Sequence, residues 1–349
     1  GSDPVTSMAL RGSRAHNDED IERFPEYLDH VAALMSAGGA HVALTRGMLA
    51  EQDYVLKDTP AAVVDTRPLA ELDLYADPKT ATGAATAVIA SNVIEKVADN
   101  PAQTLPATVT SHDPSGDIEV TVTDTSRVLA LDISGSLAAP VWGLGLGDLL
   151  VGRDISTTFP GTEDLPIVTS SSHSASAEAI LALKPTLLIT DGSIGPRDVL
   201  TQLRQSGVTV VFVPDESSFA GASDLAVKIG AALGVPEIGE QLGAKIADEV
   251  TAKIAEIAAI APADDARKLR VMFLYLRGGS GVYYLFGEDS GASELITSLS
   301  MIDIATELGW TESTPMTDEA VVEANPDLIL VMSHGIESTG GVDGLLAAK

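Results

Sequence analysis

Short runs of β-branched and other apolar residues alternate with stretches of helical periodicity from about residue 118 to the end of the chain. Strands separated by helical segments of roughly 10–15 residues are typical of βαβ units and of a mostly parallel sheet. The pattern therefore predicts an α/β fold. The predicted strands cover residues 127–132, 149–151, 186–190, 208–213, 268–275 and 327–332.

One pattern occurs twice in this region. Residues 176–190 resemble residues 317–331, because each copy begins with Ser or Thr, carries Glu two positions later and Pro nine positions later, and ends in an apolar run. Ser and Thr favour the N-cap of a helix, and the helix dipole stabilises a carboxylate in the first turn. Pro stops each helix ahead of a buried strand. The repeat predicts two similar, Rossmann-like lobes with parallel-rich sheets.

A single long helix is predicted between the two copies. Ile, Leu and Val recur every three or four residues between Pro236 and Pro262, which is the spacing of one helix face. About 25 residues at ~1.5 Å each give a rod of roughly 37 Å, long enough to connect two domains. Ligand sites prefer domain interfaces and the carboxyl ends of parallel strands, so we expect a ligand between the lobes.

The rest of the chain is harder to interpret. Residues 1–12 begin Gly-Ser-Asp-Pro and are interpreted as an expression remnant, with any signal peptide already removed. Residues 13–105 have weak periodicity and are assigned to an N-terminal extension of unknown role. The expected order is then an N-terminal lobe at 106–235, the linking helix at 236–262 and a C-terminal lobe at 263–349, which looks truncated at its end.

Charge and composition exclude several classes of function. The 349 residues carry 50 Asp and Glu against 21 Lys and Arg, a net charge of −29 that argues against nucleic acid and anionic membrane surfaces as partners. The lack of cysteine excludes disulfides, thiolate nucleophiles and iron–sulfur clusters. HExxH, GxSxG and P-loop motifs are also missing, which argues against the matching hydrolases and nucleotide-binding proteins.

Two segments carry candidate chemistry. His173 precedes the helix of the first copy, where a loop reaches the edge of its lobe; a solvated surface histidine is the alternative. Tyr275 and Arg277 share one face of a predicted strand, and a guanidinium beside a phenol stabilises the phenolate, a ligand suited to ferric iron. The alternative is a core tyrosine with its arginine reaching solvent. Gly278 and Gly279 allow the backbone to turn or to approach a ligand closely.

From about residue 105 onward the chain resembles the haem-receptor branch of the class III ABC-transporter substrate-binding proteins, of the type found in Gram-positive haem uptake. The resemblance rests on residues 123–132, 145–154, 179–185, 275–278 and 340–344. It implies that ferric haem lies between the lobes with His173 and Tyr275 as axial iron ligands. It also implies that Arg277 hydrogen-bonds the tyrosine and that Met332 lines the pocket, where Gly278 and Gly279 are expected as well.

The resemblance also implies what the protein does. We expect an extracytoplasmic binding protein, not an enzyme, that passes haem to an ABC permease and is tethered to the membrane through a lipid anchor no longer present. A ferric-siderophore or corrinoid binding protein of the same fold is one alternative. A tetrapyrrole chelatase with His173 as base is another, although no acid–base constellation supports it.

Overall fold

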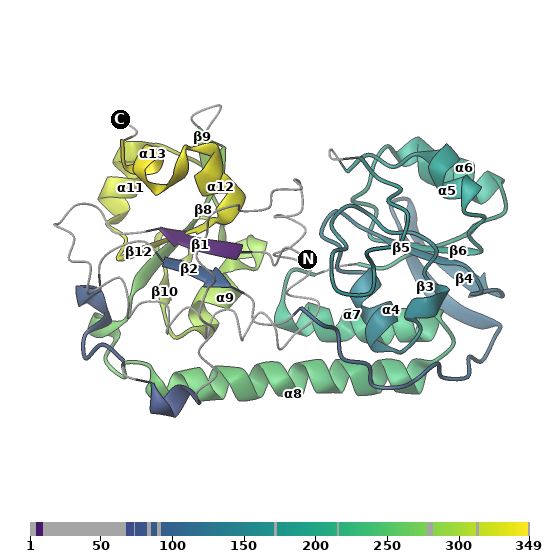
Figure 1. The fold of residues 1–349 in the computed structure, drawn as a ribbon, viewed down its shortest axis with the longest axis horizontal. Helices are drawn as coiled ribbons and strands as arrows, with labels where there is room; N and C mark the ends of the chain where they lie inside the picture. The colour runs from purple at the N-terminus through teal and green to yellow at the C-terminus, as the bar shows by residue number, and fades with distance from the viewer. Residues whose placement is uncertain are drawn as a thin grey trace. The chain divides into compact units, whose positions relative to one another are not determined.

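The computed structural model describes residues 5–9, 68–72, 74–81, 85–88, 92–170, 173–214, 216–277, 282–311 and 314–347. The chain forms two compact units, each with strands and helices of its own (Figure 1). Among the described residues, the N-terminal unit comprises residues 92–250, and the C-terminal unit comprises residues 251–347 with parts of residues 5–88. The predicted α/β fold is confirmed.

Helix α8 (Pro236–Ile260) belongs to both units, since the boundary falls after Val250. It is the long helix that the apolar periodicity predicts, and it ends just before Pro262. Its apolar positions are buried in each half, including Leu242 in the N-terminal unit and Ile257 in the C-terminal unit. Burial of one face stabilises a helix of this length more than helix propensity does.

A parallel sheet of three strands forms the centre of the N-terminal unit. Strand β5 (Val128–Leu131) pairs with β6 (Leu187–Thr190), and β6 pairs with β7 (Thr209–Phe212). The sheet and its helices share a core that includes Leu129, Leu188 and Leu203, each fully or almost fully buried. The helical elements of this unit before α8 are α4 (Ala138–Gly143), η3 (Gly147–Leu149), α5 (Ala177–Ala182), α6 (Arg197–Gln205) and α7 (Phe219–Ala232).

The strand predicted at residues 149–151 is wrong. The 3-10 turn η3 occupies Gly147–Leu149, so only Leu150 reaches the sheet, where it forms a single parallel bridge with Val128. The other five predicted strands are present, with ends shifted by one or two residues.

Strands β3 (Ala107–Asp113) and β4 (Gly116–Val122) form an antiparallel hairpin that the sequence pattern did not reveal. Side chains fasten it to the free edge of β7. The Ser111 hydroxyl accepts a hydrogen bond of 2.9 Å from an edge amide of β7 and donates one of 2.7 Å to Asp113. Asp113 also pairs with Arg204 of α6 at 2.5 Å. Fastened in this way, the hairpin covers a sheet edge that would otherwise be open to pairing with other chains.

Residues 92–106, which the sequence analysis placed mostly in an extension of unknown role, run across the N-terminal unit as a strap. Three of its backbone N–H groups donate to glycine carbonyls at 2.8, 3.1 and 2.8 Å: Val97 to Gly143, Asn100 to Gly145 and Thr104 to Gly234. The strap passes so close that a Cβ on Gly145 would lie 1.9 Å from a carbonyl oxygen. Most of the predicted extension, residues 13–67, lies outside the described part of the chain.

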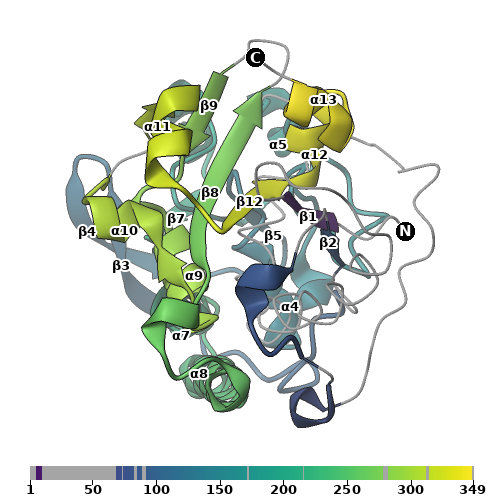
Figure 2. The same ribbon diagram turned by 90° about the vertical axis from the view of Figure 1, so that its left-hand side faces the viewer.

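A mixed sheet forms the centre of the C-terminal unit, in the order β11-β9-β8-β12-β1-β2 with β10 beside β8. Strand β8 pairs in parallel with β12 and β10, and the other four pairs are antiparallel. The prediction of a parallel-rich sheet is therefore wrong for this unit, because hairpin and edge strands join on both sides of β8 and β12. Figure 2 shows α9, α10 and α11 on one side of β8. The strands are β1 (Val5–Ala9), β2 (Ala85–Val88), β8 (Arg270–Arg277), β9 (Val282–Leu285), β10 (Ile302–Asp303), β11 (Thr314–Met316) and β12 (Leu328–Met332).

The helices after α8 are α9 (Ala292–Ser298), α10 (Ile304–Leu308), α11 (Asp318–Ala324), α12 (Ser333–Ser338) and α13 (Gly341–Ala347). The 3-10 turns are η1 (Leu69–Glu71), η2 (Pro78–Thr80), η4 (Asp265–Arg267) and η6 (Glu288–Ser290). The core of this unit includes Met272, Leu274 and Leu276, which alternate along β8 and therefore face the same side of the sheet.

Strand β1 lies within residues 1–12, which the sequence analysis left outside the fold as a remnant. It pairs antiparallel with β12, with Thr6 opposite Met332, and on its other side with β2. No strand was predicted here, because five residues with two polar positions give too short a pattern to detect.

The repeat predicted from the sequence is confirmed. In the first copy the Ser176 hydroxyl caps α5 by accepting from the Ala179 amide at 3.2 Å. In the second, Thr317 caps α11 by accepting from the Ala320 amide at 3.3 Å. Each helix is followed by a residue in the left-handed region, a proline, and a parallel strand, β6 or β12. Each unit is therefore built around one copy.

Candidate functional site

His173 lies in a tight turn between α5 and the strand-like segment before it. We call residues 169–175 the His173 turn; residues 171 and 172 within it lie outside the described part. The His173 amide donates to the carbonyl of Ser170 at 2.9 Å, and Thr169 bridges antiparallel to Ala175. The backbone of His173 has φ 55°, in the left-handed region. Its side chain is only 7% exposed, which contradicts the interpretation of a solvated surface histidine.

Two neighbouring loops hold the flanks of this turn. On one flank the Thr169 hydroxyl accepts a hydrogen bond of 2.9 Å from the Ile155 amide. On the other, the Ala175 amide donates to the carbonyl of Gly195 at 2.7 Å, next to a bridge between Ser174 and Gly195. Since the Gly195 loop follows β6, the turn lies at the carboxyl end of the parallel sheet. Ligand sites of α/β proteins favour that end.

Two fully buried carboxylates lie beneath these loops, and sequence reasoning missed them. Asp132 directly follows β5, and Asp154 lies in the loop that carries Ile155. Asp154 accepts from the amides of Asp132 at 3.3 Å and Thr157 at 2.7 Å. A polar residue directly after a fully apolar strand was a usable signal for Asp132, but its distance of 22 positions from Asp154 hid the pair.

The environment raises the pKa of both carboxyls. Burial is the main cause for Asp132, whose pKa lies well above its usual range, and the nearby charges of Asp154 and Asp191 add to it. Burial also raises the pKa of Asp154, to about 6, against hydrogen bonds from backbone amides that lower it. Desolvation disfavours a buried negative charge, whereas amide donors favour it.

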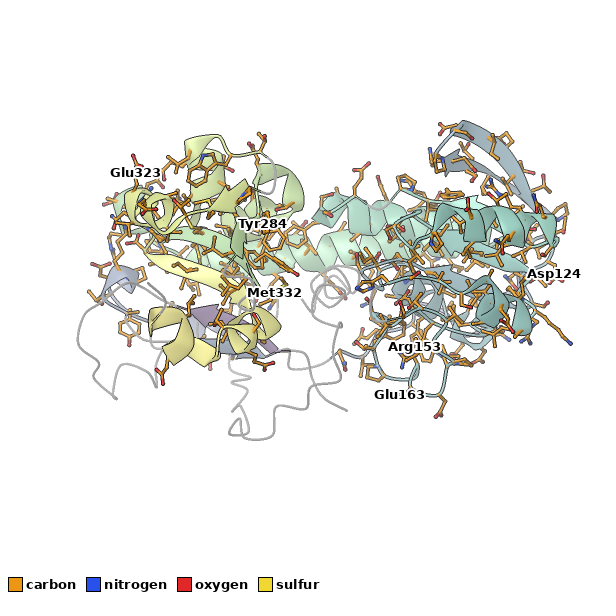
Figure 3. The ribbon with its side chains drawn as sticks, turned by 90° about the horizontal axis from the view of Figure 1, so that it is seen from above. Asp124, Arg153, Glu163, Tyr284, Glu323 and Met332 are labelled. Carbon is orange, nitrogen blue, oxygen red and sulfur yellow. The ribbon has the colours of Figure 1, made fainter. Side chains whose placement is uncertain are left out.

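Tyr275 lies on β8, in the C-terminal unit. Its ring is half-buried and meets the Phe286 ring edge-on, with centroids 6.2 Å apart. It pairs across the strands with Tyr284 of β9, which is labelled in Figure 3. Arg277 is the last residue of β8, two positions on, and the alternation along a strand puts these two positions on the same face. The side chain of Arg277, and Gly278 and Gly279, lie outside the described part.

Met332 is the last residue of β12 and is 3% exposed. The parallel register pairs its neighbour Val331 with Leu274, which brings Met332 level with Tyr275 on the adjacent strand. The structure thus brings Tyr275 and Met332 together at the carboxyl end of β8 and β12. His173 occupies the corresponding end of the sheet in the N-terminal unit.

Two cavities lie elsewhere. One of about 250 Å³ lies in the C-terminal unit, between the η2 segment and the end of α8. The other, of about 340 Å³, lies in the N-terminal unit between β3, β7 and α7. Neither is lined by His173 or Tyr275. Among the described residues, no group of three or more His, Asp or Glu side chains is placed to hold a metal ion. None of the described helices is long and apolar enough to cross a membrane.

Residues 132–348 match the family of periplasmic binding proteins. A Bacillus subtilis (strain 168) protein described as an uncharacterized ABC transporter substrate-binding lipoprotein, YvrC, is 27% identical over 215 residues, which cover 60% of this chain and 66% of that protein. The chain thus spans just under two thirds of the length of this relative.

Several solved structures are also similar. The heme binding protein HmuT is 40% identical with a TM-score of 0.65, over 72% of this chain and 80% of that one. The periplasmic heme-binding protein RhuT from Roseiflexus sp. RS-1 is 34% identical with a TM-score of 0.57, over 64% of this chain and 82% of that one. BhuT, in complex with two hemes, is 26% identical with a TM-score of 0.55, over 63% of this chain and 82% of that one.

Proposed function

The chain belongs to the periplasmic binding protein family, and from that premise we propose that it binds ferric haem and delivers it to an ABC permease. Members of this family bind substrates for transport, so the chain is an extracytoplasmic substrate-binding protein and not an enzyme. A tetrapyrrole chelatase is therefore the wrong interpretation. Tethering through a lipid anchor is part of the proposal, supported by the lipoprotein relative.

One observation carries the choice of iron ligands: His173 and Tyr275 each lie at the carboxyl end of the parallel strands of their own unit. Imidazole nitrogen and phenolate oxygen are both known axial ligands of haem iron. Crystal structures of HmuT include variants in which one His, one Tyr and one Arg are each replaced by Ala. The Tyr and the Arg replaced there are two positions apart, as Tyr275 and Arg277 are here.

The residues around these ligands have distinct tasks in the proposal. Tyr275 gives up its phenolic proton when it binds ferric iron, and the cationic Arg277 favours that loss. His173 is largely buried in a turn whose backbone is held on both flanks, so little conformational entropy is lost on ligation. Met332 offers a polarisable apolar surface to the porphyrin.

Titration with ferric haem tests the proposal. We expect saturation at about one equivalent with a shifted Soret band, and weaker binding with an altered spectrum for His173→Ala and for Tyr275→Ala. Matched controls replace the same residue types elsewhere: His112→Ala on the exposed β3–β4 hairpin, and Tyr75→Ala at the cavity beside η2. Both controls should bind as the parent does.

Three results would count against the proposal. Unchanged absorbance of free haem with folded protein would exclude haem binding. Binding of a ferric siderophore or a corrinoid without haem binding would favour the alternative ligands. A parent-like spectrum in His173→Ala or in Tyr275→Ala would remove that residue from the iron.

A further inference from the structure

Hydrogen bonds to the buried carboxylates Asp154 and Asp132 fix the loops that hold the His173 turn. The loop carrying Ile155 is shaped by Asp154, which accepts the Thr157 amide at 2.7 Å. Its neighbour Ile155 then presents its own amide to the Thr169 hydroxyl at 2.9 Å. One flank of the turn is therefore two hydrogen bonds from the Asp154 carboxylate.

The other flank leads to the second carboxylate. Asp132 accepts the amides of Ser136 and Leu137 at 2.9 and 3.1 Å, which fixes the loop after β5. In that loop the Ile133 amide donates to the Ser193 hydroxyl at 2.9 Å. Ser193 belongs to the loop that ends at Gly195, whose carbonyl accepts from the Ala175 amide of the turn.

The two residues are also linked directly, since the backbone amide of Asp132 donates to the Asp154 carboxylate at 3.3 Å. A third link joins the loops above them, where the Ser156 hydroxyl donates to the carbonyl of Ile133 at 2.6 Å. The turn and the loops around it thus form a closed circuit of hydrogen bonds and backbone, in which each carboxylate fixes one of the loops.

Keeping two carboxylates fully buried is costly. Desolvation penalises each charge, and a buried ion or ion pair is often less stable than an apolar replacement. The charge of Asp191 adds to the repulsion at Asp132. Arg153 directs its guanidinium to the carbonyl oxygens of Thr157 and Asp154 at 2.9 and 3.4 Å. The pair is satisfied by backbone amides, and those amides belong to the loops that position the turn.

We propose that Asp132 and Asp154 are positioning residues that together set the conformation of the His173 turn and so hold its imidazole ready for the iron. This inference rests on the proposed function for the identity of the ligand, but its structural half applies to the protein without haem. Pre-organisation of this kind raises affinity because the ordering cost is met before the ligand arrives.

The test removes one hydrogen bond of the circuit with the smallest change in side-chain shape. Thr169→Val removes the hydroxyl that accepts from Ile155 and keeps a β-branched side chain, and Thr169→Ser restores the hydroxyl. Asp154→Asn changes the carboxylate itself. The matched control is Thr186→Val, which removes a hydroxyl that accepts from the Arg127 amide at 3.2 Å in the same unit, outside the circuit.

Two measurements are made on each variant: amide hydrogen exchange at Ser174 and Ala175 without haem, and haem affinity with its Soret spectrum. Losing one hydrogen bond from the circuit should speed exchange at these amides and weaken haem binding, each roughly fivefold, in Thr169→Val and in Asp154→Asn. Thr169→Ser should restore both values, and Thr186→Val should leave both at the parent's level.

The outcomes separate the two claims. Exchange at Ser174 and Ala175 that stays at the parent's rate in Thr169→Val and Asp154→Asn overturns the positioning role. Equal acceleration in Thr186→Val also overturns it, since the effect is then general destabilisation. If the parent protein does not bind haem, the proposed function fails, and the exchange measurements alone still decide whether the carboxylates position the turn.

Discussion

Replacing Asp154 with Asn removes an ionisation in the interior while keeping the size of the side chain. Burial raises the pKa of this carboxyl from 3.8 to about 6, so between these values the folded protein binds a proton that the unfolded chain does not. The stability that Asp154 contributes is therefore fully present below about pH 4 and is lost as the pH rises through about 6.

The magnitude follows from the size of the shift. One pKa unit corresponds to about 1.4 kcal/mol, so a carboxyl whose pKa rises from 3.8 to about 6 changes the free energy of unfolding by about 3 kcal/mol across this range. Asp154→Asn lacks this ionisation. Relative to the variant, the parent should lose about 3 kcal/mol between about pH 4 and about pH 7.

Urea unfolding of both proteins across this range measures the effect. The difference between parent and variant cancels the titration of distant groups, and any constant offset from the lost hydrogen-bond acceptor does not change with pH. Removing the Asp154 charge also lowers the pKa of Asp132, which adds to the difference in the same direction. Asp148→Asn, an exposed carboxyl on η3, controls for the loss of one negative charge. A difference between parent and Asp154→Asn that stays flat with pH would refute the reasoning.

Three other outcomes are expected. Arg277→Ala should keep haem but raise the pH at which the tyrosinate band appears, whereas Tyr275→Ala should lose that band; a visible pH titration that shows the same midpoint in Arg277→Ala and the parent would contradict this. Burial opposes ionisation of Asp113, yet its hydrogen bonds with Arg204 and Ser111 lower its pKa overall, so the stability it contributes should be present above its usual pKa and lost as the pH falls. Asp113→Asn should therefore reduce the fall of the melting temperature at acid pH, and a fall as steep as the parent's would count against this. Gly135→Ala should lower the melting temperature by several degrees in calorimetry, because φ is 74° there and a Cβ would lie 2.6 Å from backbone; an unchanged melting temperature would show that the loop can move.

The sequence predicts those parts of the fold that local patterns encode. The caps, prolines and apolar runs of the repeat and the three-to-four spacing of α8 are local signals, and both predictions are confirmed. The β3–β4 hairpin escaped prediction because its most buried positions on β3, Ser111 and Asp113, are polar, which breaks the apolar alternation of a strand. Their partners on β7 and α6 lie 101 and 91 positions away in the sequence. Strand β1 escaped it because its five residues give too short a pattern and were interpreted as a remnant, while its partner β12 lies at the opposite end of the chain.

The candidate site divides in the same way. Tyr275 was found because a strong strand ends there, and the structure confirms the strand. His173 was found from its place before a helix, but its burial and its left-handed backbone could not be anticipated from a Ser-rich loop. The buried pair of Asp132 and Asp154 was not found, since each carboxylate alone looks like an ordinary loop residue, and their proximity depends on how two loops close over β5.

The shared helix α8 limits how the protein can be divided for study. A fragment that ends at Val250 would cut an unbroken hydrogen-bond ladder and leave the second half of the helix, with Ile257, on the other piece without its first turns. Half of the helix is too short to be stable by itself, so each fragment would need the whole of Pro236–Ile260 to keep its part of the helix folded. The two fragments would therefore have to overlap in sequence.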